Sequence, residues 1–592
     1  MLVQLIHHGI IIAPKPPVHG LVLTIRGEPV ALTARQEEMA LAWARKQGTP
    51  YVRDKVFARN FMTDFSTALS LSRRLSVDAV DFGPAIEIVV AERETKAGLN
   101  KEERKAAAAV RKVKREELKE RYGYAIANGE RIELGNYMTE PSGIFMGRGK
   151  HPLRGRWKEG AAHPDVTLNM SPDSPRPEGD WAKIVWQPDS LWVARWKDKL
   201  SGKLKYVWVS DTAPVKQARE AQKFDKAIEL GGSLEAVRAQ IQHDLSDPSD
   251  KQKMIATACY LIDALCLRVG DEKDPDEADT VGATTLRPEH ITLHPDHTVE
   301  FRFLGKDSVL WHQRIKLPPM VHENLAYLVE NACPSTTNKS RSGRDLPQVF
   351  PHITSRDVNS YLSTIQPGLS AKVFRTHHAT EVVRDSLAEC GVTADDPEYG
   401  KREAMVLANL DAAILCNHTK QAPAKWATRR VRMREQRLRA KARVDKVREQ
   451  VREYRARREA LGGEAKEKIA AASDKQRPKV RDRYRKRRAV ADRRIEAAKG
   501  RLQRARAALG KVESRNKLAG KGRTWNLGTS LKSYIDPRVC YRWGQQVDYD
   551  VIEKYYPKAL QRKFAWVADS EHQEPADEVE LGAGGNGENQ VE

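Results

Sequence analysis

The chain has 592 residues, of which 40% are hydrophobic and 31% charged, and its formal net charge is +22. This length exceeds what one hydrophobic core supports, so several domains are expected. The positive excess is not typical of a metabolic enzyme, and its natural counter-surface is a polyphosphate or an anionic membrane. No run of about 18 apolar residues occurs, which excludes a bilayer-spanning helix.

Other classes are excluded by missing signals. The first residues, M-L-V-Q-L-I-H-H-G-I-I-I, lack a basic segment and a small-residue cleavage site, which argues against a signal peptide. Six cysteines without a C-x-x-C pair indicate a reduced, intracellular protein with no cysteine-based zinc site. No H-E-x-x-H motif occurs and the histidines are scattered, so we predict chemistry without a metal.

The first 421 residues divide into three regions that differ in composition and in expected secondary structure. Residues 1–135 mix strand-like runs, such as Leu21–Ile25, with amphipathic helices, such as Glu37–Ala44, and close with a charged helix near Arg121. Residues 136–215 change to loops and strands, with the alternating runs W-A-K-I-V-W and L-W-V-A-R-W. Helices dominate residues 216–421, where V-E-F-R-F-L-G-K-D-S-V-L-W predicts a small β-patch.

The remaining residues are a charged tract followed by a short globular segment. Residues 422–523 consist mostly of Arg, Lys, Glu and Ala, with a break between Gly462-Gly463 and Pro478. Their narrow apolar stripe predicts an antiparallel helical hairpin that projects into solvent; a single solvated helix or a disordered tract is the alternative. Residues 524–568 regain globular composition, and residues 569–592 predict a disordered acidic tail.

Five residues in apolar flanks could together perform phosphoryl transfer without a metal. The reaction needs a nucleophile, cations that hold the phosphate, and an acid for the leaving oxygen. Tyrosine suits DNA because its phosphoester retains the energy of the broken bond, and arginine matches two phosphate oxygens. Singly, each residue has an ordinary explanation, such as a cation at a helix end. The five are Arg268, Lys306, Arg375, His418 and Tyr534.

In this order and with these flanks, the residues resemble the eukaryotic-type DNA topoisomerase IB family. The motifs C-Y-L-I-D-x-L-x-L-R-x-G, A-D-T-V-G, L-R-x-E-H-I-x-L-H-P, F-L-G-K-D-S, A-K-V-F-R-T, A-I-L-C-N-H, L-G-T-S and Y-I-D-P-R occur in family order. Upstream, G-I-F-M-G-R-G-K-H-P is similar to the family's DNA-clamp loop, and R-K-F-A-W-V is similar to its C-terminal end. The resemblance runs from about residue 8 to 568, although the charged tract matches by composition only.

The resemblance implies an α+β multidomain DNA clamp. Its expected parts are a mixed α/β N-terminal cap (1–135), a strand and loop clamp region (136–215), a mainly helical catalytic core with a small β-sheet (216–421), a projecting helical-hairpin linker, or coiled coil (422–523), a small helical C-terminal domain (524–568) and the acidic tail (569–592).

The resemblance also implies a role for each of the five residues. Tyr534 would attack the scissile phosphate, form a 3′-phosphotyrosyl bond and release a 5′-hydroxyl. Arg268, Arg375 and His418 would hold the non-bridging oxygens, and Lys306 would protonate the 5′ oxygen. Strand swivelling and religation would then relax supercoils without ATP, a metal or another cofactor.

Four further residues are expected to contact DNA. Arg148 and Lys150 match the clamp loop, Asp307 follows the lysine, and Ser533 precedes the tyrosine where the family commonly has Asn. The expected partner is double-stranded DNA enclosed by a monomer, with no membrane and no nucleotide cofactor. The expected location is on the chromosome: in the nucleus if the source is eukaryotic, in the cytoplasm or nucleoid if it is archaeal, bacterial or viral.

The sequence leaves two alternatives open. A tyrosine recombinase shares the chemistry but joins two duplexes through four subunits, and the long hairpin before the tyrosine favours the topoisomerase. A non-catalytic basic nucleic-acid-binding protein would need only the charge, and its Tyr534 would be dispensable.

Overall fold

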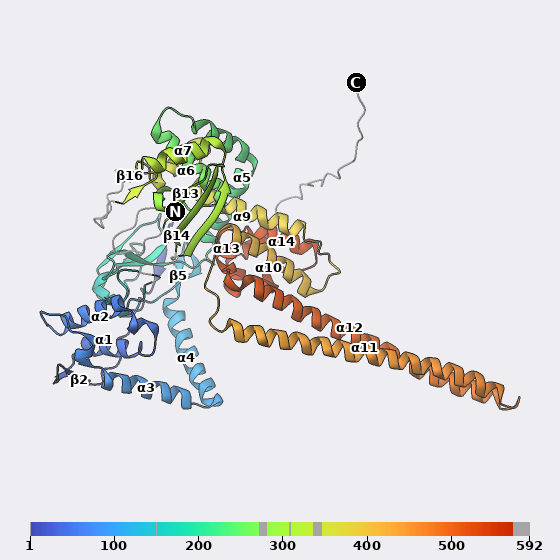
Figure 1. Ribbon diagram of the computed structural model, residues 1–592. Coiled ribbons are helices and arrows are strands. Elements are labelled where there is room, and N and C mark those ends of the chain that lie inside the picture. Colours follow the sequence, from blue (N-terminus) through green and yellow to red (C-terminus); the bar gives the residue numbers. More distant parts are fainter. Residues whose placement is uncertain are drawn as a thin grey trace, which may run out of the picture. The chain divides into compact units, whose positions relative to one another are not determined.

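The computed structural model describes residues 2–147, 149, 151–270, 281–306, 309–335 and 346–571 (Figure 1). The chain separates into two compact units, Met1–Phe374 and Arg375–Glu592. Each unit is described by itself. None of the described helices combines the length and the apolar character that crossing a membrane requires.

The first unit begins with helices packed beside a small antiparallel sheet. Asp54 caps the second helix by accepting from the backbone N–H groups of Val56 and Phe57, and Trp43 stacks on Phe61 inside the core. This core is therefore aromatic and well defined. Its elements are β2 (Val22–Ile25), β3 (Glu28–Ala31), β4 (Val80–Asp81), α1 (Ala34–Ala44), α2 (Lys55–Ala68), α3 (Gly83–Gly98) and α4 (Lys101–Tyr122), with the strands in the order β3-β2-β4.

Two further sheets and a short strand pair follow in the same unit. The first sheet joins β1 (Leu5–His7) to β5 (Tyr124–Ala127) and β6 (Glu130–Glu133). The second has the order β10-β9-β11-β12, and only β9 and β10 pair in parallel. Its strands are β9 (Val166–Asn169), β10 (Lys183–Val185), β11 (Trp192–Lys197) and β12 (Leu204–Trp208), and β7 (Gly143–Ile144) pairs with β8 (Trp157–Lys158).

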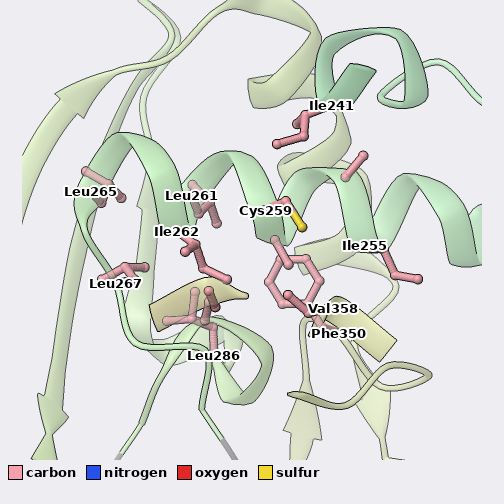
Figure 2. Packing of buried hydrophobic residues seen from close by; sticks show 14 of the residues in the cluster. Ile241, Ile255, Cys259, Leu261, Ile262, Leu265, Leu267, Leu286, Phe350 and Val358 are labelled. Carbon is pink, nitrogen blue, oxygen red and sulfur yellow. The ribbon is translucent and has the colours of Figure 1, made fainter. Parts of the chain in front are cut away.

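The rest of the first unit is a helical layer on an antiparallel sheet. The helix α6 supplies Cys259 and Ile262, which are fully buried and face Leu286 and Phe350 in the core around it (Figure 2). The elements are α5 (Pro214–Asp244), α6 (Asp250–Leu265), β13 (Ile291–Leu293), β14 (Thr298–Gly305), β15 (Val309–Lys316), α7 (Pro319–Glu330), β16 (Cys333–Pro334), β17 (Pro347–Gln348), α8 (Ser355–Ile365) and the start of α9 (Ala371–Ala388).

The second unit is helical. The helices α11 (Trp426–Ala470) and α12 (Arg477–Lys521) lie antiparallel, side by side, and extend away from α10 (Glu398–Leu415) (Figure 1). Ion pairs such as Arg437–Glu513 and Arg458–Asp492 join the two arms. After them come α13 (Leu527–Ser533), α14 (Pro537–Gln546), α15 (Val551–Lys554), α16 (Lys558–Lys563) and α17 (Trp566–Glu571).

The predicted α+β class is confirmed in its coarse form. The chain combines several small sheets with many helices, and its C-terminal region is helical. The turn between the long helices lies at residues 471–476, and Pro478 stands in the first turn of α12. The turn therefore lies in the predicted interval between Gly462-Gly463 and Pro478, and the two glycines themselves lie inside α11. The predicted acidic tail lies outside the described residues from residue 572 onward.

Candidate active site

Tyr534 lies at a junction between two helices. The helix α13 ends at Ser533, and Tyr534 is its C-cap with φ −128° and ψ −31°. Pro537 disfavours helical geometry in the residue before it, so Asp536 is extended and instead caps α14 by accepting from the backbone N–H of Arg538. The motif Y-I-D-P-R therefore spans the end of α13 and the beginning of α14, and Tyr534 lies at the end of α13.

Arg375 and His418 both lie against this tyrosine. The guanidinium carbon of Arg375, on α9, lies 5.0 Å from the centroid of the Tyr534 ring. The imidazole of His418 lies 5.3 Å from the same ring, centroid to centroid. All three side chains are buried, with 4%, 6% and 9% of the surfaces of Arg375, His418 and Tyr534 exposed. The second unit thus brings three of the five predicted residues into one cluster.

Backbone and side-chain partners orient Arg375 and His418. The guanidinium of Arg375 donates from Nη2 to the carbonyl of Cys416 at 3.2 Å, where α10 ends. Asn417 has φ +50°, the left-handed conformation that commonly terminates helices, and it turns the chain into His418. The Nδ1 atom of His418 lies 2.7 Å from the hydroxyl of Ser530. Because Nδ1 is engaged there, Nε2 is the nitrogen that would face a phosphate.

The long hairpin begins and ends at the same place. Thr419 pairs with Trp525 in an antiparallel bridge, and the backbone N–H of Asn526 donates to the carbonyl of His418 at 2.6 Å. The backbone N–H of Lys420 donates to Thr524 at 2.7 Å. The chain therefore leaves from the residue after His418 and returns beside it, which brings the tyrosine to the histidine.

Three other tyrosines near the C-terminus lie in surroundings that disfavour their phenolates. Burial raises the pKa of Tyr549, of Tyr555 and of Tyr556 above the ordinary value for a phenol. A raised pKa disfavours the phenolate that attack requires. Burial likewise raises the pKa of the Cys540 thiol to about 12. Tyr534, beside a guanidinium and an imidazole, has the surroundings that stabilise developing negative charge.

Arg268 and Lys306 belong to the first unit. The helix α6 stops at Leu265 because Cys266 adopts φ +49°, so Arg268 lies beyond the helix and not on it. Its carbonyl accepts from the backbone N–H of Ala283 at 2.8 Å, which holds this segment to the core. Lys306 directly follows β14 and is exposed at the end of the β14–β15 ladder, whose last pair is Gly305–Val309.

The predicted DNA contacts are described in part. Arg148, Lys150 and Asp307 lie outside the described residues, whereas Ser533 is half-buried at the end of α13. The segment after the clamp loop is anchored on α2: Arg154 donates to Asp54 at 2.7 Å. No group of three or more metal-binding side chains occurs among the residues that the structure describes.

Sequence reasoning missed three groups that this geometry uses. They are Ser530 beside His418, the Cys416 carbonyl beside Arg375, and Thr380, whose hydroxyl contacts the backbone around Tyr534. Ser530 is the last residue of the motif L-G-T-S. Thr380 carries no motif signal, since only the fold places it opposite the tyrosine.

Family models match nearly the whole chain. The model of the eukaryotic DNA topoisomerase I DNA-binding fragment matches residues 3–209, and that of the catalytic core matches residues 212–451. A model of the C-terminal topoisomerase domain matches residues 506–574. Arg268, Lys306, Arg375 and His418 fall within the core match, and Tyr534 falls within the C-terminal one.

Similar proteins carry the same family name. The chain is 30% identical over 580 residues to "DNA topoisomerase 1 beta" of Arabidopsis thaliana, a match that covers 95% of this chain and 58% of the plant protein. It is 31% identical to "DNA topoisomerase I, mitochondrial" of Homo sapiens, over 95% of this chain and 89% of that protein. It is 29% identical to human "DNA topoisomerase 1", over 95% and 70%. The chain therefore belongs to the eukaryotic-type DNA topoisomerase I family, the type IB topoisomerases that its motifs predicted.

Proposed function

We propose that this chain relaxes supercoiled duplex DNA by cutting one strand, letting it swivel, and resealing it. The observation that carries the proposal is the cluster of Tyr534 with Arg375 and His418, three buried side chains from separate elements. In such a cluster the phenol is the nucleophile, and the guanidinium and the imidazole are the groups that would bind the phosphate.

The chemistry is a balanced exchange of esters. The phenol proton of Tyr534 passes to water as its oxygen attacks phosphorus, a new P–O bond forms, and the bond to the 5′ oxygen breaks. Lys306 donates the proton that the 5′ oxygen takes up, while Arg268, Arg375 and His418 hold the non-bridging oxygens. Because the phosphotyrosyl bond retains the energy of the phosphodiester, the 5′-hydroxyl reverses the step without ATP.

The remaining regions would bind and control the DNA. The N-terminal cap (1–135) and the clamp region (136–215), with Arg148 and Lys150, would enclose the duplex together with the core, as one monomer. Asp307 and Ser533 would contact DNA near the break. The basic hairpin α11–α12 would lie near the downstream DNA and slow its rotation through attraction to phosphates. A protein with these functions works on chromosomal DNA.

The two alternatives are less well supported. The plant and human relatives, which match 95% of the chain, are named topoisomerases and not recombinases. A purely architectural protein would not need a buried phenol packed against a guanidinium and an imidazole.

The test is relaxation of a supercoiled plasmid in EDTA without ATP. The wild-type protein should relax the plasmid and form a covalent DNA adduct. Tyr534→Phe should bind DNA but form no adduct, because the attacking oxygen is gone. Tyr541→Phe is the matched control, since it removes a half-buried hydroxyl on α14 away from the cluster, and it should keep activity.

Two outcomes would defeat the proposal. If supercoils persist with the wild-type protein, the chain lacks the proposed activity. If Tyr534→Phe relaxes the plasmid fully, Tyr534 is not the nucleophile. Obligatory exchange between two DNA sites would instead indicate a recombinase.

A further inference from the structure

We infer that Thr380 is a positioning residue for the nucleophile: its hydroxyl fastens the backbone on both sides of Tyr534 to α9, the helix that carries Arg375. The inference rests on the proposed function, because it assumes that Tyr534 attacks the phosphate. It concerns a residue that does not touch the reacting atoms.

The hydroxyl of Thr380 makes two hydrogen bonds to one short stretch of backbone. Its Oγ1 donates to the carbonyl oxygen of Tyr534 at 3.2 Å. The same oxygen accepts from the backbone N–H of Asp536 at 3.1 Å. One donor and one acceptor are thus used on a single turn, and Thr380 itself is only 4% exposed.

Helix α13 satisfies only the start of this stretch, where the backbone N–H groups of Tyr534 and Ile535 donate to the carbonyl of Ser530; the carbonyl of Tyr534 and the N–H of Asp536 bond to Thr380 instead. Pro537 keeps Asp536 out of helical geometry, so α13 cannot run on into α14. Ile535 and Asp536 are buried, at 0% and 2% exposure, so their backbone groups cannot form hydrogen bonds with bulk water. A buried backbone group without a partner is costly, and Thr380 supplies the partner at this junction.

The same contact sets the distance between the nucleophile and Arg375. Thr380 and Arg375 lie five residues apart on α9, a rise of about 7.5 Å along one continuous helix. By covalent connection the path from Arg375 to Tyr534 runs through the whole hairpin, α11 and α12. The Thr380 hydroxyl therefore links the tyrosine segment directly to the helix that carries Arg375. Because of this direct link, movement of the hairpin need not displace the tyrosine.

The experiment compares Thr380→Val, Thr380→Ser and Ser386→Ala. Valine keeps the shape of threonine but loses both hydrogen bonds, and serine keeps the hydroxyl. Ser386 lies on the same helix and its hydroxyl donates to Asp411 at 2.9 Å, so its loss removes one hydrogen bond from α9 away from the tyrosine. The substrate is a duplex whose cut strand releases a short fragment, which makes cleavage irreversible and gives a single-turnover rate.

Thr380→Val should cleave on the order of 10²-fold more slowly, as expected for a nucleophile displaced by about 1 Å, with unchanged affinity for uncut DNA. Thr380→Ser should restore most of the rate, and Ser386→Ala should cleave as the wild type does. Melting temperatures of all variants identify any unfolding. Wild-type cleavage by a folded Thr380→Val, or an equal loss in Ser386→Ala, would overturn the inference. Absence of an adduct with the wild-type protein would instead overturn the proposed function.

Discussion

Gly282→Ala should misplace Arg268. Gly282 and Gly270 lie backbone to backbone beside the arginine, and Gly270 has φ +90°, which side chains rarely adopt. A methyl group on Gly282 would lie 2.5 Å from the backbone nitrogen of Gly270 and 2.8 Å from the carbonyl oxygen of Arg268. All of these atoms belong to the main chain, so the clash cannot be relieved by rotating a side chain.

The size of the effect follows from these distances. Non-bonded heavy atoms prefer separations of about 3.5 Å or more, so the segment with Arg268 must move by about 1 Å. Overpacking of this kind costs roughly 1–3 kcal/mol of stability. Because Arg268 is proposed to hold the phosphate, a 1 Å displacement of it is expected to slow cleavage by about 10²-fold. Affinity for DNA should change little, because most of it comes from phosphate contacts elsewhere.

The assay is single-turnover cleavage together with thermal unfolding. Gly232→Ala is the control: Gly232 is an exposed residue of α5 with open space around it, and alanine there should be neutral or stabilising. Cleavage by Gly282→Ala at the wild-type rate would refute the reasoning about Arg268. An unchanged melting temperature together with an unchanged rate would also refute the packing argument.

Two other predictions concern hydrogen-bonded histidines. Burial lowers the pKa of His7 to about 4, so the unfolded chain binds a proton there below pH 6.5 that the folded one refuses, and about 3 kcal/mol of stability should be lost as the pH falls from 6.5 to 4. Urea unfolding across this range should show a loss of the free energy of unfolding that is smaller in His7→Gln. An equal dependence of this free energy on pH in both proteins would contradict the prediction. Ser530→Ala removes the oxygen beside Nδ1 of His418 and should slow cleavage about fivefold, equivalent to about 1 kcal/mol; an unchanged rate would mean that the histidine is oriented otherwise.

Local patterns predicted the elements well. The charged helix expected near Arg121 is α4, and the Trp-rich run L-W-V-A-R-W covers all but the last residue of β11. The break between the two arms was predicted only as an interval, because each glycine of Gly462-Gly463 costs a helix only about 1 kcal/mol and does not by itself end it. Leu461 and Ala465, on either side of the pair, pack against Tyr484 of the other arm and keep α11 helical.

The residues of the cluster were predictable from the sequence, but the hydrogen bonds that hold them were not. Motif order identified Arg375, His418 and Tyr534, because each stands in a distinctive flank. The contact of Thr380 with the tyrosine segment joins residues 154 and 156 positions apart, and no local period signals such a pair. Arg268 departs from its helix because Cys266 is left-handed, a conformation that is uncommon for cysteine.

The closed base of the hairpin also has a consequence for biosynthesis. His418 is translated more than a hundred residues before Tyr534, and in the folded protein the two rings lie together at the base of the hairpin, beside the Thr419–Trp525 bridge. At 5–20 residues per second, a ribosome needs about 5–20 s to cover that interval. During this time the nascent chain already carries the residues expected to grip DNA but not the one expected to cut it. A chain stopped early would therefore occupy DNA without breaking it.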